Sequence, residues 1–148
     1  MKHHTQKDRN HIGRDMEYYI KELLDANFSY TDAYDVVKNK WCVEVKSCSY
    51  ITKQGNKSNG DFRIGRFVID REAHLGLLES SSFPIYVFIV RVDDDKIIRW
   101  IFASDVDNLL KKKYPKLNVK SNCMCINWTT IIKNGLRIEE LHKFMRYA

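Results

Sequence analysis

The sequence lacks a hydrophobic run long enough to cross a membrane. Its longest apolar segment, residues 83–92, is interrupted by Pro84 and Arg91 and is much shorter than the roughly 20 residues that a spanning helix needs. Residues 1–7 are polar and contain no apolar stretch, so we expect no secretory signal peptide. These absences favour a cytoplasmic protein over a membrane or secreted one.

The cysteine spacing argues against a zinc site. The four cysteines are Cys42, Cys48, Cys123 and Cys125. The gaps within each pair do not match those of common zinc-binding motifs. Without a secretory signal, reduced thiols are expected. We therefore predict no zinc centre.

The composition that is present indicates one basic globular domain. The 148 residues are 44% hydrophobic and 30% charged, which is ordinary for a chain that buries a core. Aromatic residues make up 12%, so large rings are expected in that core. The net charge of +6 suits a polyanionic partner such as nucleic acid, or an anionic membrane surface. A basic protein with no such partner would carry the same charge.

Hydrophobic periodicity and turn signals predict an α/β domain with a central mixed sheet flanked by helices. The first twelve residues are expected to form a flexible basic tail, and residues 13–148 a single domain without repeats or linkers. The expected helices are 13–26, 70–80, 104–110 and 138–147, and the expected strands are 34–38, 41–47, 84–92, 96–102 and 127–132.

The stretch 34–47 organises the rest of the chain. It predicts two strands joined by a tight turn at residues 38–40. Alternation along the second strand places Trp41, Val43 and Val45 on one face and Cys42, Glu44 and Lys46 on the other. Asp35, one strand away, can bring a second carboxylate beside Glu44. Two carboxylates and an ammonium group would form a site for a hard divalent cation and an activated water. The alternative, a surface salt bridge between Glu44 and Lys46, does not account for Asp35.

Basic residues follow this stretch and are candidates for nucleic-acid contact. Residues 49–66 read as a flexible basic loop, and such loops on a rigid sheet often carry binding residues. An ordinary solvated loop is the alternative reading. The candidates in the loop and the following helix are Lys53, Lys57, Arg63, Arg66, Arg71 and His74.

Asp35 and the triplet Glu44-Val45-Lys46 resemble the motif of the PD-(D/E)XK nuclease superfamily, whose members share the restriction-endonuclease-like fold. The topological resemblance covers residues 13–110. The resemblance is greatest for small archaeal-type Holliday junction resolvases and small restriction-like enzymes. Residues Gly13–Glu17 resemble the start of the first helix in those resolvases. Tyr34 stands where the motif has proline. No glutamine is evident on the following helix, where His74 is the candidate for its place.

The resemblance implies a Mg²⁺-dependent endodeoxyribonuclease, with Mn²⁺ as a substitute, acting on DNA as a homodimer and specific for structures such as Holliday junctions. It implies that Asp35, Glu44 and the Val45 carbonyl bind the metal, with Glu17 as an accessory carboxylate. Lys46 would orient the attacking water and offset negative charge. The alternatives are a sequence-specific restriction-like endonuclease, an inactive nucleic-acid-binding module of the same fold, and an interaction domain with no nucleic-acid role.

Overall fold

The computed structural model describes residues 6–29, 34–53, 62–80, 83–115 and 123–145. The helices in these ranges are α1 (Gln6–Leu24), α2 (Arg71–Leu78), α3 (Ala103–Lys113), α4 (Trp128–Asn134) and α5 (Ile138–Met145). The strands are β1 (Asn27–Phe28), β2 (Val36–Lys38), β3 (Trp41–Ser49), β4 (Ile51–Lys53), β5 (Phe62–Ile64), β6 (Arg66–Asp70), β7 (Phe83–Val92), β8 (Asp95–Phe102), β9 (Cys123–Asn127) and β10 (Leu136–Arg137).

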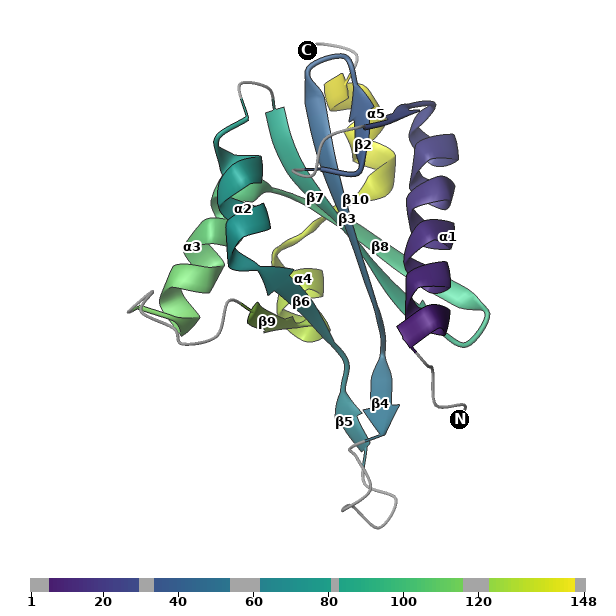
Figure 1. Ribbon diagram of the computed structural model, residues 1–148, viewed down its shortest axis with the longest axis vertical. Coiled ribbons are helices and arrows are strands. Elements are labelled where there is room, and N and C mark those ends of the chain that lie inside the picture. The colour runs from purple at the N-terminus through teal and green to yellow at the C-terminus, as the bar shows by residue number, and fades with distance from the viewer. Residues whose placement is uncertain (1–5, 30–33, 54–61, 81–82, 116–122, 146–148) are drawn as a thin grey trace.

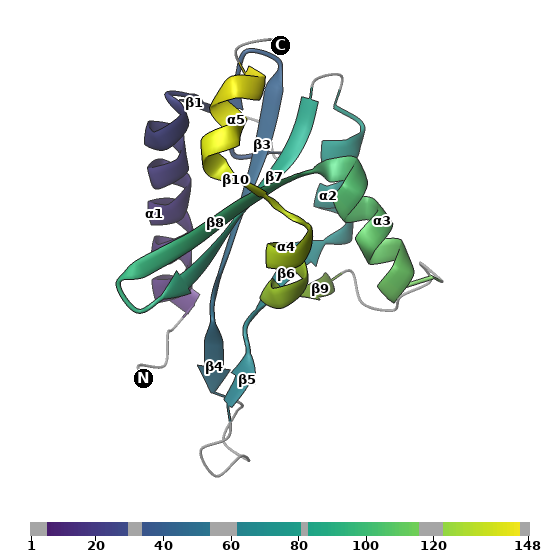
Figure 2. The ribbon, with the colours of Figure 1, turned by 180° about the vertical axis from the view of Figure 1, so that it is seen from behind.

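A mixed six-stranded sheet forms the centre of the molecule, in the order β1-β2-β3-β7-β8-β10. Only β3 and β7 pair in parallel, and the other neighbours in this sheet are antiparallel. Helices α1 and α5 cover one face, and α2, α3 and α4 lie on the other (Figures 1 and 2). The predicted α/β architecture with a central mixed sheet is therefore confirmed.

Local sequence accounts for the elements that frame the parallel pair. The tight turn between β2 and β3 places Asn39 at φ 53°, a left-handed conformation that asparagine tolerates well. Asp70 caps α2, because its carboxylate accepts a hydrogen bond from Ala73 N at 2.9 Å. Strand β7 is buried from Ile85 to Val90, as expected of a strand covered on both faces.

Three parts of the structure differ from the prediction. Helix α1 begins at Gln6, so residues 6–12 are helical and the expected tail boundary at residue 13 is wrong. The expected loop 49–66 contains strands β4 and β5, which form a ribbon projecting from the body (Figure 1). The expected strand 127–132 is instead the end of β9 followed by helix α4, in which Ile131 is fully buried. There, tertiary packing overrides the β preference of a Trp-Thr-Thr-Ile-Ile sequence.

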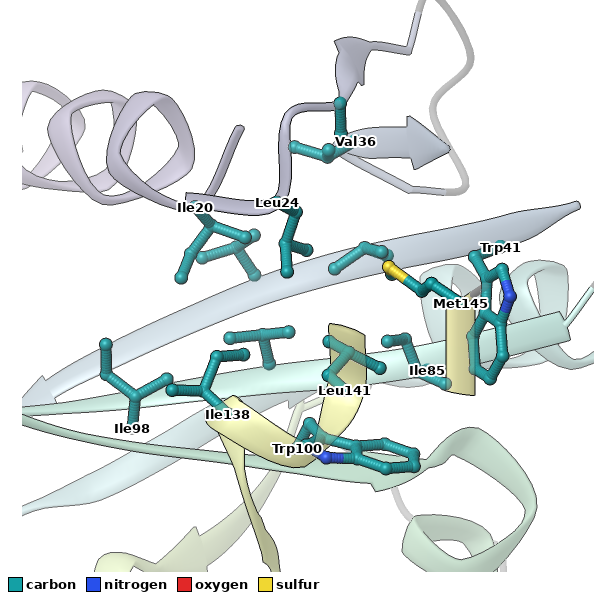
Figure 3. Close-up of a cluster of buried hydrophobic side chains, with 14 of the residues drawn as sticks. Ile20, Leu24, Val36, Trp41, Ile85, Ile98, Trp100, Ile138, Leu141 and Met145 are labelled. Atoms are coloured by element: carbon teal, nitrogen blue, oxygen red, sulfur yellow. The ribbon is translucent and has the colours of Figure 1, made fainter. Parts of the chain in front are cut away.

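Two buried clusters lie on the two faces of the sheet. Figure 3 shows the cluster beneath α1 and α5, where Trp100 and Trp41 pack with aliphatic side chains such as Ile20 and Leu141. The opposite cluster contains Phe67, Tyr86 and Phe88 among others. The predicted large aromatic rings are thus in the core. None of the helices in the described ranges is both long and apolar enough to span a bilayer.

Candidate functional site

Asp35 lies where β2 separates from β3. The ladder between these strands ends with Val36 opposite Val43, and Asp35 N then donates to Val43 O at 2.9 Å. The Asp35 carboxylate turns back toward β3, where Oδ2 accepts a hydrogen bond from Val45 N at 2.8 Å. Because the N–H and C=O of one strand residue point to the same side, the Val45 carbonyl also faces this edge. Where β2 and β3 diverge, the Asp35 carboxylate and the Val45 carbonyl therefore present oxygen atoms along the same edge of β3.

Three carboxyl groups meet at this edge. Asp35 shares side-chain hydrogen bonds with both Glu44 on β3 and Glu17 on α1. Two carboxyl groups can share a hydrogen bond only when one of them carries a proton. Glu44 is only 8% exposed, so water contributes little to its stabilisation. We call Glu17, Asp35 and Glu44 the carboxylate cluster.

Burial and mutual repulsion raise the proton affinity of this cluster. Burial raises the pKa of Glu44 to about 9, and the hydrogen bond and charge of Asp35 add to the effect. Burial, and then the charge of Asp35, raise the pKa of Glu17 to about 7. The carboxylate cluster thus has more negative charge than its neighbours neutralise. A divalent cation would supply the missing charge and displace protons.

The ammonium group of Lys46 faces the carboxylate cluster. Its charge lowers the pKa of both Glu17 and Glu44, although less than burial raises them. Lys46 occupies the same face of β3 as Glu44, two residues along the strand. The structure therefore brings together the four side chains predicted as catalytic.

The donor set fits a hard cation that keeps much of its water. Within the described ranges, no three histidine, cysteine, aspartate or glutamate side chains are placed so as to enclose a metal ion alone. Mg²⁺ commonly takes only one or two carboxylates from the protein and fills its remaining positions with water and substrate phosphate. Asp35, Glu44 and the Val45 carbonyl match that sparse requirement.

A network of hydrogen-bonded polar side chains extends from the carboxylate cluster toward α2 and α3. Tyr86 lies opposite Glu44 in the β3–β7 register, and its hydroxyl is 2.7 Å from His74 Nδ1. His74 Nε2 is 3.0 Å from Asp107, whose other oxygen bonds Lys111 at 2.7 Å. Burial would raise the pKa of Asp107, but the hydrogen bonds from Lys111 and His74 keep it below its ordinary value. This network satisfies the hydrogen-bonding groups of polar side chains beneath the site. It was not predicted from the sequence, because its members are far apart along the chain.

The predicted nucleic-acid contacts have different positions in the structure. His74 is 2% exposed and both its ring nitrogens are engaged, so it does not present a surface to a nucleic acid, which corrects that prediction. Arg63 and Arg66 are exposed, and Arg63 Nε donates to Thr52 Oγ1 at 3.1 Å. Arg71 is half-buried at the start of α2. The remaining two predictions are Lys53, whose side chain lies outside the description, and Lys57, which lies outside the described residues.

Comparison with known families identifies the superfamily of the chain. A model of the PD-(D/E)XK nuclease superfamily domain matches residues 3–133, which is most of the chain. The fold and the match define a nuclease, a class of hydrolase whose substrate is nucleic acid. The protein belongs to the PD-(D/E)XK nuclease superfamily, whose members generally use divalent metal ions. No curated protein matches the chain.

Replacing Glu44 by glutamine is expected to stabilise the metal-free protein at high pH. A carboxyl whose pKa is raised by folding costs stability when it ionises, so the free energy of unfolding should fall as pH rises from about 4.5 to about 9. Glutamine removes that ionisation and can still hydrogen-bond Asp35. In the presence of a chelator at about pH 8, we expect the Tm of Glu44→Gln to exceed that of the wild type by roughly 3–10 °C. The difference should shrink at about pH 5.

Glu79→Gln is the matched control, because Glu79 is exposed at the C-terminal end of α2. Its Tm should follow the wild type across the same pH range. A Glu44→Gln protein that is less stable than the wild type at every pH would contradict the charge excess inferred for the carboxylate cluster.

Proposed function

We propose that this nuclease is a Mg²⁺-dependent endodeoxyribonuclease that hydrolyses phosphodiester bonds in DNA and acts on branched structures such as four-way junctions. The observation that carries the proposal is the meeting of Asp35, Glu44 and the Val45 backbone at the open edge of β3. Lys46 adds a positive charge at the same place. The net charge of +6 supports a polyanionic substrate.

Each group in the site has a distinct role in the proposal. Asp35, Glu44 and the Val45 carbonyl hold Mg²⁺, or Mn²⁺ in its place, and Glu17 accepts a hydrogen bond from a water beside it. When bound, the metal lowers the pKa of water and offsets charge on the scissile phosphate. Lys46 Nζ orients the attacking water and stabilises the negative charge that develops on the phosphate oxygens.

The proposal includes a two-fold homodimer. Each chain carries one carboxylate cluster, and symmetric cutting of two strands takes two such sites. A sedimentation measurement with and without DNA would test this part separately from cleavage.

A cleavage panel tests the proposed function. Wild-type protein would be incubated with linear duplex, single strand, four-way junction and structured RNA, with Mg²⁺ and with a chelator. We expect Mg²⁺-dependent internal cleavage of DNA, fastest on the branched substrate. Lys46→Ala should reduce the rate by about 10²-fold, because it removes one stabilising charge from the transition state.

Lys40→Ala is the matched control for Lys46→Ala. Lys40 is exposed at the turn between β2 and β3, so its replacement changes net charge equally without touching the carboxylate cluster. Equal activity of wild type and Lys46→Ala would identify a contaminant. Salt-sensitive DNA binding without any metal-dependent product would favour the inactive binding module, and cleavage confined to one duplex sequence would favour the restriction-like enzyme.

A further inference from the structure

Two exposed aromatic rings lie next to the carboxylate cluster. Tyr18 on α1 is 56% exposed and Phe28 on β1 is 39% exposed. Their ring centroids are 6.3 Å apart, with the planes tilted by 39°. Both rings lie outside the two buried clusters of the sheet. They therefore form an apolar surface that folding of the described residues leaves accessible.

The chain ties both rings to the carboxylate cluster. Tyr18 directly follows Glu17 in α1. Phe28 pairs with Val36, and the next residue donates from Ser29 N to the Asp35 carbonyl at 2.9 Å. Figure 2 shows β1 next to the C-terminal end of α1. Helix α1 thus carries both Tyr18 and Glu17, and β1 places Phe28 beside the strand that follows Asp35.

A hollow of about 390 Å³ lies beside the two rings and Glu17. The described residues that line it are Arg14, Asp15, Glu17, Tyr18 and Phe28. Its volume is at the lower end of the roughly 300–1,000 Å³ typical of ligand pockets. Glu17 lines this hollow and also bonds Asp35, so the hollow opens directly beside the carboxylate cluster.

The ammonium group of Lys21, which also pairs with Glu22 at 3.2 Å, lies beside the aromatic pair. Lys21 Nζ lies 5.7 Å from the Tyr18 ring centroid and 5.5 Å from that of Phe28. Lys21 is not among the described residues that line the hollow, so it flanks the rings without filling the space beside them. Arg14, which lines the hollow, is close enough to Glu17 to lower its pKa. Rings combined with cations suit a flat, anionic ligand.

We propose that the hollow holds one unpaired base of the substrate strand, stacked on Tyr18 and Phe28, next to the phosphate that is cut. Base–aromatic stacking accepts any base, because every base has a π-face. Lys21 and Arg14 then contact the backbone phosphates on either side. This inference rests on the proposed nuclease function and adds to it a preference for strands that carry an unpaired nucleotide at the cleavage site.

Binding of a fluorescent base tests the inference without requiring cleavage. In buffer that contains a metal chelator, DNA carrying 2-aminopurine at an unpaired position would be titrated with wild-type protein and with the Tyr18→Leu/Phe28→Leu double variant. We expect stacking to quench the fluorescence in the wild type, and the double variant to lose the quenching and about 10-fold in affinity. Affinity for fully paired duplex should change little. Tyr18→Phe keeps the ring and should behave as the wild type.

Phe62→Leu is the matched control, because Phe62 is a 58% exposed aromatic residue on the β4–β5 ribbon. Its quenching and affinity should equal the wild type. Unchanged quenching in the double variant would overturn the inference, and so would a dimer in the wild type that dissociates in the double variant, since a second copy would then cover the rings. Quenching without cleavage of any substrate would support the inference and contradict only the nuclease reaction.

Discussion

Asp35→Asn is expected to reduce Mg²⁺-dependent cleavage by about 10³-fold while leaving the protein folded. Asp35 is the only member of the carboxylate cluster that bonds both other members, and its Oδ2 also accepts from Val45 N. Asparagine keeps an oxygen that can accept this backbone hydrogen bond. It removes the negative charge that a divalent cation needs at this position. The variant should therefore lose metal affinity and turnover, and its stability should be retained or increased.

Two measurements separate loss of metal from loss of fold. Calorimetric titration with Mg²⁺ should show weaker binding in Asp35→Asn, and single-turnover cleavage should show the slower step at saturating DNA. Asp94→Asn, which removes an exposed carboxylate in the turn between β7 and β8, is the control and should cleave as the wild type does. If the two variants cleaved equally fast, Asp35 would have no part in the reaction.

The local part of the site could be predicted from sequence because it depends on one hairpin. A period of two along β3 fixes that Glu44 and Lys46 share a face, and the turn at Asn39 fixes which residue of β2 lies opposite. Asp35 follows from that register. These relations involve residues within about a dozen positions of one another, so no knowledge of tertiary packing is needed.

Contacts that depend on packing between distant elements could not be predicted. The helical spacing of α1 shows an amphipathic face but does not show that Glu17 reaches Asp35, which came only from the resemblance. From the sequence His74 is a candidate for nucleic-acid contact, whereas its burial against Tyr86 depends on how α2 packs on β7. Similarly, Trp128 Nε1 donates to Tyr50 O at 2.7 Å across 78 positions, which helps to fix the start of α4. Propensity alone carries no information on such pairs.

The core that supports the site extends beyond the family match, which ends at residue 133. Leu136 on β10 pairs with Trp100, and α5 contributes Ile138 and Leu141 to the cluster beneath α1 (Figure 3). The same cluster includes Ile20 from the helix that carries Glu17. The C-terminal segment therefore helps to position one of the three carboxyl groups, although it supplies none of them.

Trp100→Ala is expected to lower the free energy of unfolding by about 3–5 kcal/mol. Trp100 is fully buried, makes edge contacts with Trp41 and Phe102, and donates from Nε1 to the Arg137 carbonyl at 3.1 Å. Alanine would leave a large cavity and an unpaired carbonyl. Because the free energy of unfolding of natural domains is only about 5–15 kcal/mol, this change would remove a substantial part of the stability.

Denaturant unfolding of Trp100→Ala beside Trp100→Phe and Phe62→Ala measures the loss. Trp100→Phe keeps a ring but removes the bond to Arg137, so an intermediate loss is expected, whereas the exposed Phe62 should contribute less than about 0.5 kcal/mol. Trp100 lies on β8, two strands away from the β3 residues of the site, so cleavage per folded molecule should change far less than stability does. A Trp100→Ala protein as stable as the wild type would show that β10 and α5 do not pack on β8. The packing of α1, and with it the position of Glu17, would then depend on contacts with β2 and β3 alone.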